Sequence, residues 1–498
     1  MGDRRGDEVH QVGPDHGAPD RPADRSDRRP HRRRPRRRTL AGRASGTGGS
    51  PAASDPLAPG IHPTVEAAVR AATAAQRTFA ALPLAARGRI LAAIRATMLE
   101  NAEPLARAAR EETGLGRWED KVMKNRLVAE RTPGLEELSP YAVSGDRGLT
   151  LVEPAPFGVI GAITPSTNPT STIICNAIGM LAAGNAVVFC VHPTARACSM
   201  ATVALLNQAI RGAGGPPDVV TCISQPSIAA AQEVMAHPGV RLVVVTGGGA
   251  VVKAAMASGK RAICAGPGNP PVVVDETANL EKAGRDIVLG ASTDNNIICV
   301  DEKSVFVVES AADRLLAAMA AAGAVVLDRA RLPELSRAVF ASDPGPRGRG
   351  AMRHDLIGRD AAVVLGRIGI SVPAATRLAV VEVDESHPLL WSEQMMPVLP
   401  VCRVPDAGRA IDLAIACEGG NRHTAVMHST HLDRLSRMAK ECDCSIFVKN
   451  GRSQAGLGLD GEGYCSFTIA SPTGEGLTGP RQFSRWRRCV LVDHFRIT

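Results

Sequence analysis

One cysteine carries the clearest chemical signal in this chain. Cys299 ends the run Asp-Asn-Asn-Ile-Ile-Cys at residues 294–299. The thiolate is the form of cysteine that attacks carbon, and an ordinary thiol with a pKa of about 8.5 is only a few per cent ionised at neutral pH. A loop between apolar side chains and backbone N–H groups can hold and use a thiolate. The run therefore predicts a nucleophile, although most of the 12 cysteines fit better as small buried hydrophobic residues.

A second polar motif could serve the same reaction. Thr-Pro-Ser-Thr-Asn-Pro at 164–169 follows directly after an apolar stretch that is typical of a strand. A fixed side-chain amide next to the attacked carbon stabilises the alkoxide that forms there. Asn168 could supply this amide, and as an isolated motif it would equally suit the N-cap of the following helix.

Two glycine-rich stretches are candidates for contact with a nucleotide. Val-Thr-Gly-Gly-Gly-Ala at 245–250 combines a strand end, a turn and a helix start. Glycines let the backbone approach a pyrophosphate, and a helix N-terminus favours anions. The pattern is not GxGxxG and is weak evidence alone. The second stretch is Ala-Gly-Pro-Gly-Asn-Pro-Pro at 265–271, whose glycines would otherwise be turn formers.

Alternating strands and helices position these motifs. Strands are predicted at 157–164, 186–191, 218–223 and 241–246, with helices at 170–183, 194–211, 227–236 and 250–258. This alternation implies right-handed βαβ units and a parallel, doubly wound sheet, which binds nucleotides at the carboxyl ends of its strands. A second α/β unit follows, with strands at 271–274, 305–308, 325–327 and 377–383. Amphipathic helices precede both units from residue 63 onward.

Composition sets the class of the protein. A chain of 498 residues with 44% hydrophobic residues predicts two or three globular domains. No run of 18 apolar residues exists, so no membrane span is expected. Without CxxC pairs or a secretory signal, we expect reduced thiols, no metal site and a cytoplasmic location.

The basic charge is concentrated at the N-terminus. Residues 1–45 contain 13 Arg and 7 acidic residues, while the rest has 45 basic and 43 acidic residues. Residues 1–57 lack a core-forming pattern and predict a disordered Arg-rich tail, or a stretch upstream of the true start. The arginine cluster at 32–38 could touch nucleic acid. The near-neutral remainder argues against a nucleic-acid-binding or scaffolding protein, so no nucleic-acid partner is expected.

Taken together, the motifs resemble those of CoA-acylating aldehyde dehydrogenases of the propanediol- and ethanolamine-utilisation type. The resemblance covers about 60–498 and includes Asp-Lys-Val-Met-Lys-Asn at 120–125 and Gly-Gly-Asn-Arg-His-Thr-Ala at 419–425. It implies an α/β, aldehyde dehydrogenase-like fold. A Rossmann-type NAD/CoA-binding domain at 58–265 would precede a catalytic domain at 266–460. Residues 461–498 would return to the cofactor domain and form, with the strand at 148–154, a small oligomerisation sheet.

The resemblance also implies roles for single residues. Cys299 would be the nucleophile, Asn168 the oxyanion donor and Glu393 a ligand of the nicotinamide ribose. His423 could assist proton transfer from CoA, although a hydrogen-bonded core histidine would have the same sequence signature. The cofactor-binding positions are Thr164, Pro165, Ser166, His192, Pro193, Thr246, Gly247, Gly248, Gly266 and Glu393.

One difference from hydrolytic aldehyde dehydrogenases indicates which molecule accepts the acyl group. Hydrolytic relatives have Glu-Leu-Gly-Gly-Lys-Ser-Pro in place of residues 265–271, and the Glu that activates their water falls at Ala265. Without that carboxylate, water near a thioester lacks a general base, and the thiol of CoA can take the acyl group. The expected reaction is NAD-dependent oxidation of a short aldehyde, such as propionaldehyde or acetaldehyde, to acyl-CoA. Ile297 and Ile298, which crowd the nucleophile, favour short substrates.

Two other enzyme activities are considered. A hydrolytic aldehyde dehydrogenase giving a carboxylic acid is disfavoured by Ala265 and by His192, where such enzymes have Lys. A semialdehyde-type reductase acting on an acyl phosphate lacks the stretches around Asn269 and His423. A homodimer or homotetramer is expected. Relatives often enter bacterial microcompartments through an amphipathic N-terminal helix, and residues 1–57 contain no such apolar stripe.

Overall fold

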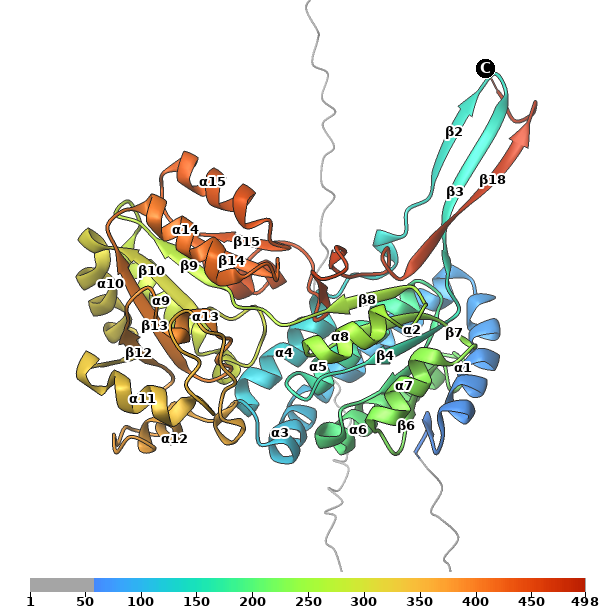
Figure 1. Cartoon of the computed structure of the whole chain (residues 1–498). Coiled ribbons are helices and arrows are strands. Elements are labelled where there is room, and N and C mark those ends of the chain that lie inside the picture. The colour runs from blue at the N-terminus through green and yellow to red at the C-terminus, as the bar shows by residue number, and fades with distance from the viewer. Residues whose placement is uncertain (1–57, 498) are drawn as a thin grey trace, which may run out of the picture. The chain divides into compact units, whose positions relative to one another are not determined.

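Two parallel sheets form the frame of the fold (Figure 1). The structure, a computed structural model, describes residues 58–497, so the predictions for the tail at 1–57 lie outside the described residues. The first sheet has the strand order β1-β6-β5-β4-β7-β8. Its strands are β1 Ile61–His62, β4 Val159–Ile163, β5 Ala186–Cys190, β6 Val220–Ile223, β7 Val240–Thr246 and β8 Ala262–Ala265.

Helices cover the first sheet on both faces, which is why its central strands are apolar throughout. All residues of β4 and β5 are buried, and so are all 14 residues of α5. Helices α1 and α7 contact each other and pack against the central strands from one layer, while α5 and α6 contact each other and pack against β5 and β6 from a second layer. The helices of this part are α1 Val65–Ala80, α2 Leu84–Glu100, α3 Ala102–Thr113, α4 Trp118–Arg131, α5 Pro169–Ala182, α6 Arg196–Gly212, α7 Ile228–Ala236 and α8 Gly249–Met256.

The second sheet has the order β11-β12-β13-β10-β9-β14-β15. Its strands are β9 Pro271–Val274, β10 Ser304–Val308, β11 Val325–Leu327, β12 Ala379–Glu382, β13 Val398–Val404, β14 Thr424–His428 and β15 Ile446–Lys449. Helix α14 packs against β9 and β10, and α9 packs against α10. The helices are α9 Leu280–Ala291, α10 Glu309–Ala321, α11 Leu332–Val339, α12 Ala361–Gly366, α13 Pro388–Trp391, α14 Ala407–Glu418 and α15 Leu432–Cys442.

A three-stranded antiparallel sheet projects from the first sheet (Figure 1). It consists of β2 Tyr141–Gly145, β3 Gly148–Pro156 and β18 Ser484–Val492. Strand β3 pairs with β18 over nine residues, from Pro156 with Ser484 to Gly148 with Val492. Several large apolar side chains of this sheet are exposed, namely Tyr141, Val143, Trp486, Val490, Leu491 and Val492. A short antiparallel pair, β16 Ile469–Ala470 with β17 Gly476–Leu477, packs against β8 through β16.

The predicted α/β class with two parallel sheets and a small antiparallel sheet is confirmed. The predicted strands of both parallel sheets are present, with ends that differ by one or two residues. The predicted change of unit at 265/266 falls between β8 and β9, which belong to different sheets. The domain boundaries themselves stay a prediction. None of the helices within residues 58–497 is long and apolar enough to span a membrane.

Candidate active site

The loop that carries Cys299 has an unusual backbone. After α9 ends, residues Asp294, Asn295 and Asn296 have φ values of 45°, 58° and 63°. Few non-glycine residues adopt this left-handed conformation, and Asp and Asn tolerate it best because their short side chains bond to nearby groups. The run Asp-Asn-Asn at 294–296 is therefore what this tight loop requires, and the side chains of its members hold it in place.

Two of these side chains anchor the loop to its surroundings. Asn295 Nδ2 donates to the carbonyl oxygen of Gly358 at 3.0 Å and to Asp360 Oδ1 at 2.9 Å. Asn296 Nδ2 donates to the carbonyl oxygens of Ala291 at 2.7 Å and of Glu302 at 2.9 Å. Both side chains are buried.

Lys303 fixes the loop from the other side. Its fully buried ammonium donates to the carbonyl oxygen of Asn296 at 2.6 Å, to Asn296 Oδ1 at 2.7 Å and to the carbonyl oxygen of Ile298 at 3.1 Å. Asp301 accepts from the backbone N–H of Ile298 at 3.0 Å. Burial raises the pKa of Glu302 to about 7 and lowers the pKa of Lys303. Asp301, Glu302 and Lys303, three consecutive charged residues that normally indicate a surface turn, are thus buried next to the loop of Cys299.

Cys299 itself is partly exposed. Burial of its sulfur, followed by the nearby charge of Glu393, raises the thiol pKa to about 12, although Lys303 partly offsets these effects. At neutral pH the resting residue is therefore a thiol. It needs a bound positive charge or a base to become the nucleophile.

Glu393 lies beside Cys299. It follows α13, is half-buried, and accepts a long hydrogen bond of 3.5 Å from the backbone N–H of Gly268 to Oε1. Desolvation raises the pKa of the Glu393 carboxyl, and Lys303 counteracts this. The loop after β8 and the segment after α13 thus bring Gly268, Glu393 and Cys299 together.

His423 joins this group and is fully buried. Its Nδ1 shares a hydrogen bond of 2.9 Å with Thr424 Oγ1. Its Nε2 has no hydrogen-bond partner among residues 58–497. Burial, followed by the charge of Lys303, lowers the pKa of His423 to about 4. The sequence left open whether this is a hydrogen-bonded core histidine. The structure shows a core histidine that is only half hydrogen-bonded, because Nδ1 has a partner and Nε2 has none within residues 58–497.

Asn168 stands at the N-cap position of α5 but its side chain does not cap the helix. Instead, its Oδ1 accepts from Lys124 Nζ at 2.6 Å, and its Nδ2 donates to Thr167 Oγ1 at 3.2 Å. The side chain is buried, with 6% of its surface exposed. The cap alternative that the sequence left open therefore does not explain this side chain.

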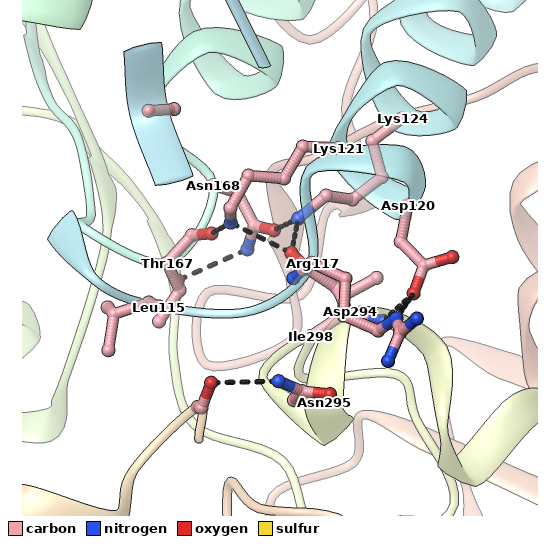
Figure 2. A network of polar contacts seen from close by, with 12 residues as sticks. Leu115, Arg117, Asp120, Lys121, Lys124, Thr167, Asn168, Asp294, Asn295 and Ile298 are labelled. Atoms are coloured by element: carbon pink, nitrogen blue, oxygen red, sulfur yellow. Dashed lines mark hydrogen bonds and ion pairs between the residues drawn. The ribbon is translucent and has the colours of Figure 1, made fainter. Parts of the chain in front are cut away.

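A buried ionic network joins Asn168 to the nucleophile loop, as Figure 2 shows. Lys124 and Lys121 from α4 both donate to Asp294 Oδ2, the latter at 2.9 Å. Lys121 also donates to the carbonyl oxygen of Thr167 at 3.2 Å. Burial lowers the pKa of Lys121 to about 8. The sequence assigned no role to Lys121, Lys124 or Asp294. Its one signal was the Asp-Lys-x-x-Lys-Asn motif at 120–125.

The candidate nucleotide-binding residues lie at the carboxyl ends of strands in the first sheet. Thr164 follows β4 with its Oγ1 buried and unpartnered within residues 58–497. Half-buried Pro165 and Ser166 connect it to the segment of Asn168. After β5, His192 is exposed at the surface and its Nδ1 shares a hydrogen bond of 2.8 Å with Thr194 Oγ1. Partial desolvation of the ring lowers its pKa. Pro193 next to it is also exposed.

The glycine turn after β7 fits a phosphate group. Gly248 caps α8 with its backbone, and a Cβ atom on Gly248 would meet no atom within 4 Å. Gly247 has less room, because its Cβ would lie 2.9 Å from a methyl group of Val251. Thr246 Oγ1 bonds to Thr468 Oγ1 at 2.9 Å. The first backbone N–H groups of a helix have no partner within the helix, so the N-terminus of α8 is a candidate site for a dinucleotide pyrophosphate.

Ala265 and Gly266 mark the exit from β8. Ala265 is buried, and its carbonyl oxygen accepts from the backbone N–H of Gly247 at 3.1 Å. A Cβ on Gly266 would lie 2.9 Å from the ring of Pro472. The loop after β8 therefore lies close to the glycine turn on one side and to Cys299 on the other, with no carboxylate between residues 262 and 271.

Comparisons with known proteins agree with this geometry. A model of the aldehyde dehydrogenase family matches residues 59–459. The chain is 51% identical over 415 residues to acetaldehyde dehydrogenase (acetylating) EutE of Salmonella typhimurium, covering 83% of this chain and 89% of that protein. It is similar to a crystal structure of Rhodopseudomonas palustris propionaldehyde dehydrogenase with bound CoA and an acylated cysteine. The identity is 50%, the TM-score 0.84, and the coverage 87% of this chain and 98% of that one.

A further solved structure is a propionaldehyde dehydrogenase from the Clostridium phytofermentans fucose utilisation bacterial microcompartment. It is 44% identical with a TM-score of 0.85, and the match covers 88% of this chain and 100% of that chain.

Proposed function

The chain belongs to the aldehyde dehydrogenase family, and on that premise we propose that it oxidises a short-chain aldehyde and transfers the acyl group to CoA. NAD is the hydride acceptor in this proposal, and the acyl group is carried as a thioester on Cys299. Acetaldehyde and propionaldehyde are the substrates that the names of its relatives favour.

The observation that carries the choice of CoA over water is the loop after β8. Its backbone packs against Cys299 at Gly268, and the buried Ala265 occupies the sequence position at which hydrolytic relatives, by resemblance, have their water-activating glutamate. Glu393 is a carboxylate beside the thiol, and we assign it to the nicotinamide ribose rather than to water. Without a carboxylate at this position to activate it, water is a poor acceptor, while a thiol is inherently a better nucleophile toward a thioester.

In the first half-reaction, the Cys299 thiol gives up its proton, the one that the overall reaction releases to solvent, and the resulting thiolate adds to the aldehyde carbon. The carbonyl oxygen becomes an alkoxide, which the side-chain amide of Asn168 and the backbone N–H of Cys299 would stabilise. NAD supplies the hydride acceptor when bound, and loss of the hydride leaves an acyl thioester on Cys299. Glu393 would orient the ribose next to this carbon. Gly247, Gly248 and the N-terminus of α8 would hold the pyrophosphate.

In the second half-reaction, the thiol of CoA attacks the thioester carbon. The proton of that thiol needs an acceptor, and His423 is our candidate, because its ring lies against Gly268 and its Nε2 has no hydrogen-bond partner within residues 58–497. The new carbon–sulfur bond forms as the bond to Cys299 breaks, and the Cys299 thiolate is regenerated. The pKa of Cys299, raised to about 12, means that this sulfur takes up a proton before the next cycle.

Two further proposals concern the assembly of the enzyme and its location. The exposed apolar side chains of β2 and β18 suit burial against a second copy, so we propose a homo-oligomer formed through this sheet. A cavity of about 670 Å³ at the base of the sheet, lined by Leu82, Leu151 and Arg487 among others, offers a matching surface. One relative comes from a bacterial microcompartment, which makes encapsulation a hypothesis for this chain.

An assay of NADH formation with propionaldehyde, with and without CoA, tests the proposal. We expect sustained NADH formation and propionyl-CoA only when CoA is present. Sustained formation of propionate without CoA would instead favour the hydrolytic activity.

A further inference from the structure

We propose that Lys124 is a positioning residue that fixes the orientation of the Asn168 amide and strengthens it as a hydrogen-bond donor to the alkoxide. Asp294 ties the same ammonium to the nucleophile loop. The proposal rests on the assignment of Asn168 as oxyanion donor in the proposed function.

The orientation follows from the chemistry of the contact. An ammonium group only donates hydrogen bonds, so the atom of Asn168 that lies 2.6 Å from Lys124 Nζ has to be the carbonyl oxygen. The NH₂ group consequently points the other way. One of its two hydrogens is given to Thr167 Oγ1 at 3.2 Å, and the contacts within residues 58–497 leave the second one free. The amide therefore offers one N–H to a bound alkoxide. A rotated amide would offer an oxygen and repel it.

The strength of this donor follows from burial. The Lys124 side chain is 2% exposed, so water screens its charge very little. A hydrogen bond from an ammonium to an amide oxygen withdraws electron density from the amide and makes its N–H groups better donors. The alkoxide exists only after Cys299 has attacked, so this gain is larger in the transition state than in the substrate complex.

Asp294 connects the Lys124–Asn168 pair to the loop that ends in Cys299 (Figure 2). Its fully buried carboxylate accepts from Lys124 and Lys121 through Oδ2, and from the backbone N–H of Arg117 at 2.6 Å through Oδ1. A Cβ atom on Gly116 would overlap this carboxylate. The carboxylate therefore has one place in which to lie. Asp294 belongs to the loop that ends in Cys299 and also binds Lys124, which holds the Asn168 amide.

Lys121 provides a matched control within the same network. Both lysines come from α4, both side chains are 2% exposed, and both donate to Asp294 Oδ2. Their remaining bonds differ, because Lys121 donates to the backbone oxygen of Thr167 while Lys124 donates to the side chain of Asn168. Loss of either lysine removes one positive charge from Asp294, but only loss of Lys124 frees the amide.

The test compares Lys124→Met, Lys121→Met, Asn168→Ala and the double variant Lys124→Met/Asn168→Ala. The readout is the rate of the NADH burst with saturating propionaldehyde and NAD in the absence of CoA, so the identity of the acyl acceptor does not affect it. We expect a 10–100-fold slower burst for Lys124→Met with KM for NAD within threefold, and a burst within fivefold of wild type for Lys121→Met. The double variant should be no slower than the slower of the two single variants.

Two further measurements keep the outcome decisive. The thermal unfolding midpoint and the alkylation rate of Cys299 report whether each variant keeps its fold and its nucleophile loop. If Lys124→Met does not fold, Lys124→Gln retains a neutral donor and is expected to lie between Lys124→Met and wild type in rate. Equal losses in the two lysine variants, or effects of Lys124→Met and Asn168→Ala that multiply, would overturn the proposal. A failure of the proposed function would instead appear as CoA-independent turnover of the wild-type enzyme.

Discussion

Gly268 faces the main chain of Cys299 so closely that no side chain fits between them. A Cβ atom on Gly268 would lie 2.5 Å from the carbonyl oxygen of Cys299 and 3.0 Å from the ring of His423. The backbone N–H of Gly268 meanwhile points to Glu393 at 3.5 Å. This glycine therefore sets how closely the loop after β8 approaches the nucleophile, the candidate base and the candidate ribose ligand.

The first prediction follows from this contact. Gly268→Ala should lower the rate of NADH formation by about 10²-fold, because displacement of a reacting group by about 1 Å costs that much. The thermal unfolding midpoint should change much less. Gly366→Ala is the control, since a Cβ there meets no atom within 4 Å. Wild-type activity in Gly268→Ala would show that the loop yields without moving Cys299.

The second prediction concerns the pH dependence of the Cys299 thiol. Iodoacetamide reacts with the thiolate, and a thiol pKa raised to about 12 means that the thiolate fraction increases with pH throughout the accessible range. The alkylation rate of the free enzyme, followed by mass spectrometry of the Cys299 peptide, should rise about tenfold per pH unit from pH 7 to 10. An ordinary thiol would level off near its pKa of about 8.5. Cys299→Ala, which should form no NADH but still bind NAD, identifies the signal of this residue. A plateau below pH 9 would contradict the prediction.

The third prediction separates two effects of Glu393. Its negative charge raises the pKa of Cys299, so Glu393→Gln should lower that pKa and accelerate alkylation at pH 9, by up to about tenfold for a shift of one unit. If Glu393 also holds the nicotinamide ribose, KM for NAD should rise in the same variant. Glu309→Gln is a suitable control that also removes one carboxylate charge. Glu309 is the first residue of α10, and its exposed carboxylate forms an ion pair with Arg403. Faster alkylation without a change in KM would leave Glu393 an electrostatic role only.

The sequence predicted the parts of the fold that depend on local patterns. The alternation of apolar strands and helices gave both parallel sheets, because strands such as β4 and β5 are buried on both faces and are apolar throughout. A loop before Cys299 was also predicted from the polar run that precedes it, whereas the left-handed backbone of Asp294 and its two Asn neighbours was recognised only in the structure.

The supporting contacts of the site could not be predicted in this way. Lys124 and Asp294 are 170 positions apart in the sequence, and no local periodicity indicates that one buried carboxylate faces two lysines. Asp301, Glu302 and Lys303 have the composition of a solvated turn, yet all three are fully buried under the nucleophile. Asp294 is bound by two lysines of α4, Asp301 by Gln454 and Glu302 by Ser453, and only the folded chain brings these distant partners together.

The fourth prediction tests His423 as the acceptor of the CoA proton. With a pKa lowered to about 4, its imidazole is neutral and able to accept a proton at any pH above about 5. His423→Gln should slow CoA-dependent turnover by roughly 10²-fold or more, while the CoA-independent burst stays within a few-fold of wild type. In the wild type, the contribution of this base should be lost only as the pH falls toward 4, where the imidazole becomes protonated.

His428 provides the matched control for this prediction. It lies at the other end of β14, is also buried with an unpartnered Nε2 within residues 58–497, and burial lowers its pKa to about 4 as well. His428→Gln should leave both half-reactions near wild type. If the two variants lose CoA-dependent turnover equally, the role of His423 is structural.

The last prediction tests the acyl acceptor. Because Ala265 and the rest of the loop after β8 provide no carboxylate, a thioester on Cys299 should hydrolyse slowly. Without CoA, the enzyme should release NADH in a burst about equal to its active sites and then continue only slowly. Addition of CoA should restore steady turnover and give acyl-CoA, which mass spectrometry distinguishes from the free acid. Ala265→Glu should raise the CoA-independent rate if its carboxylate reaches a water near the thioester. The site of Ala265 is buried, so this variant is also expected to lose part of its stability. Steady release of free acid by the unmutated enzyme without CoA would contradict the acylating reaction and leave only the membership in the aldehyde dehydrogenase family.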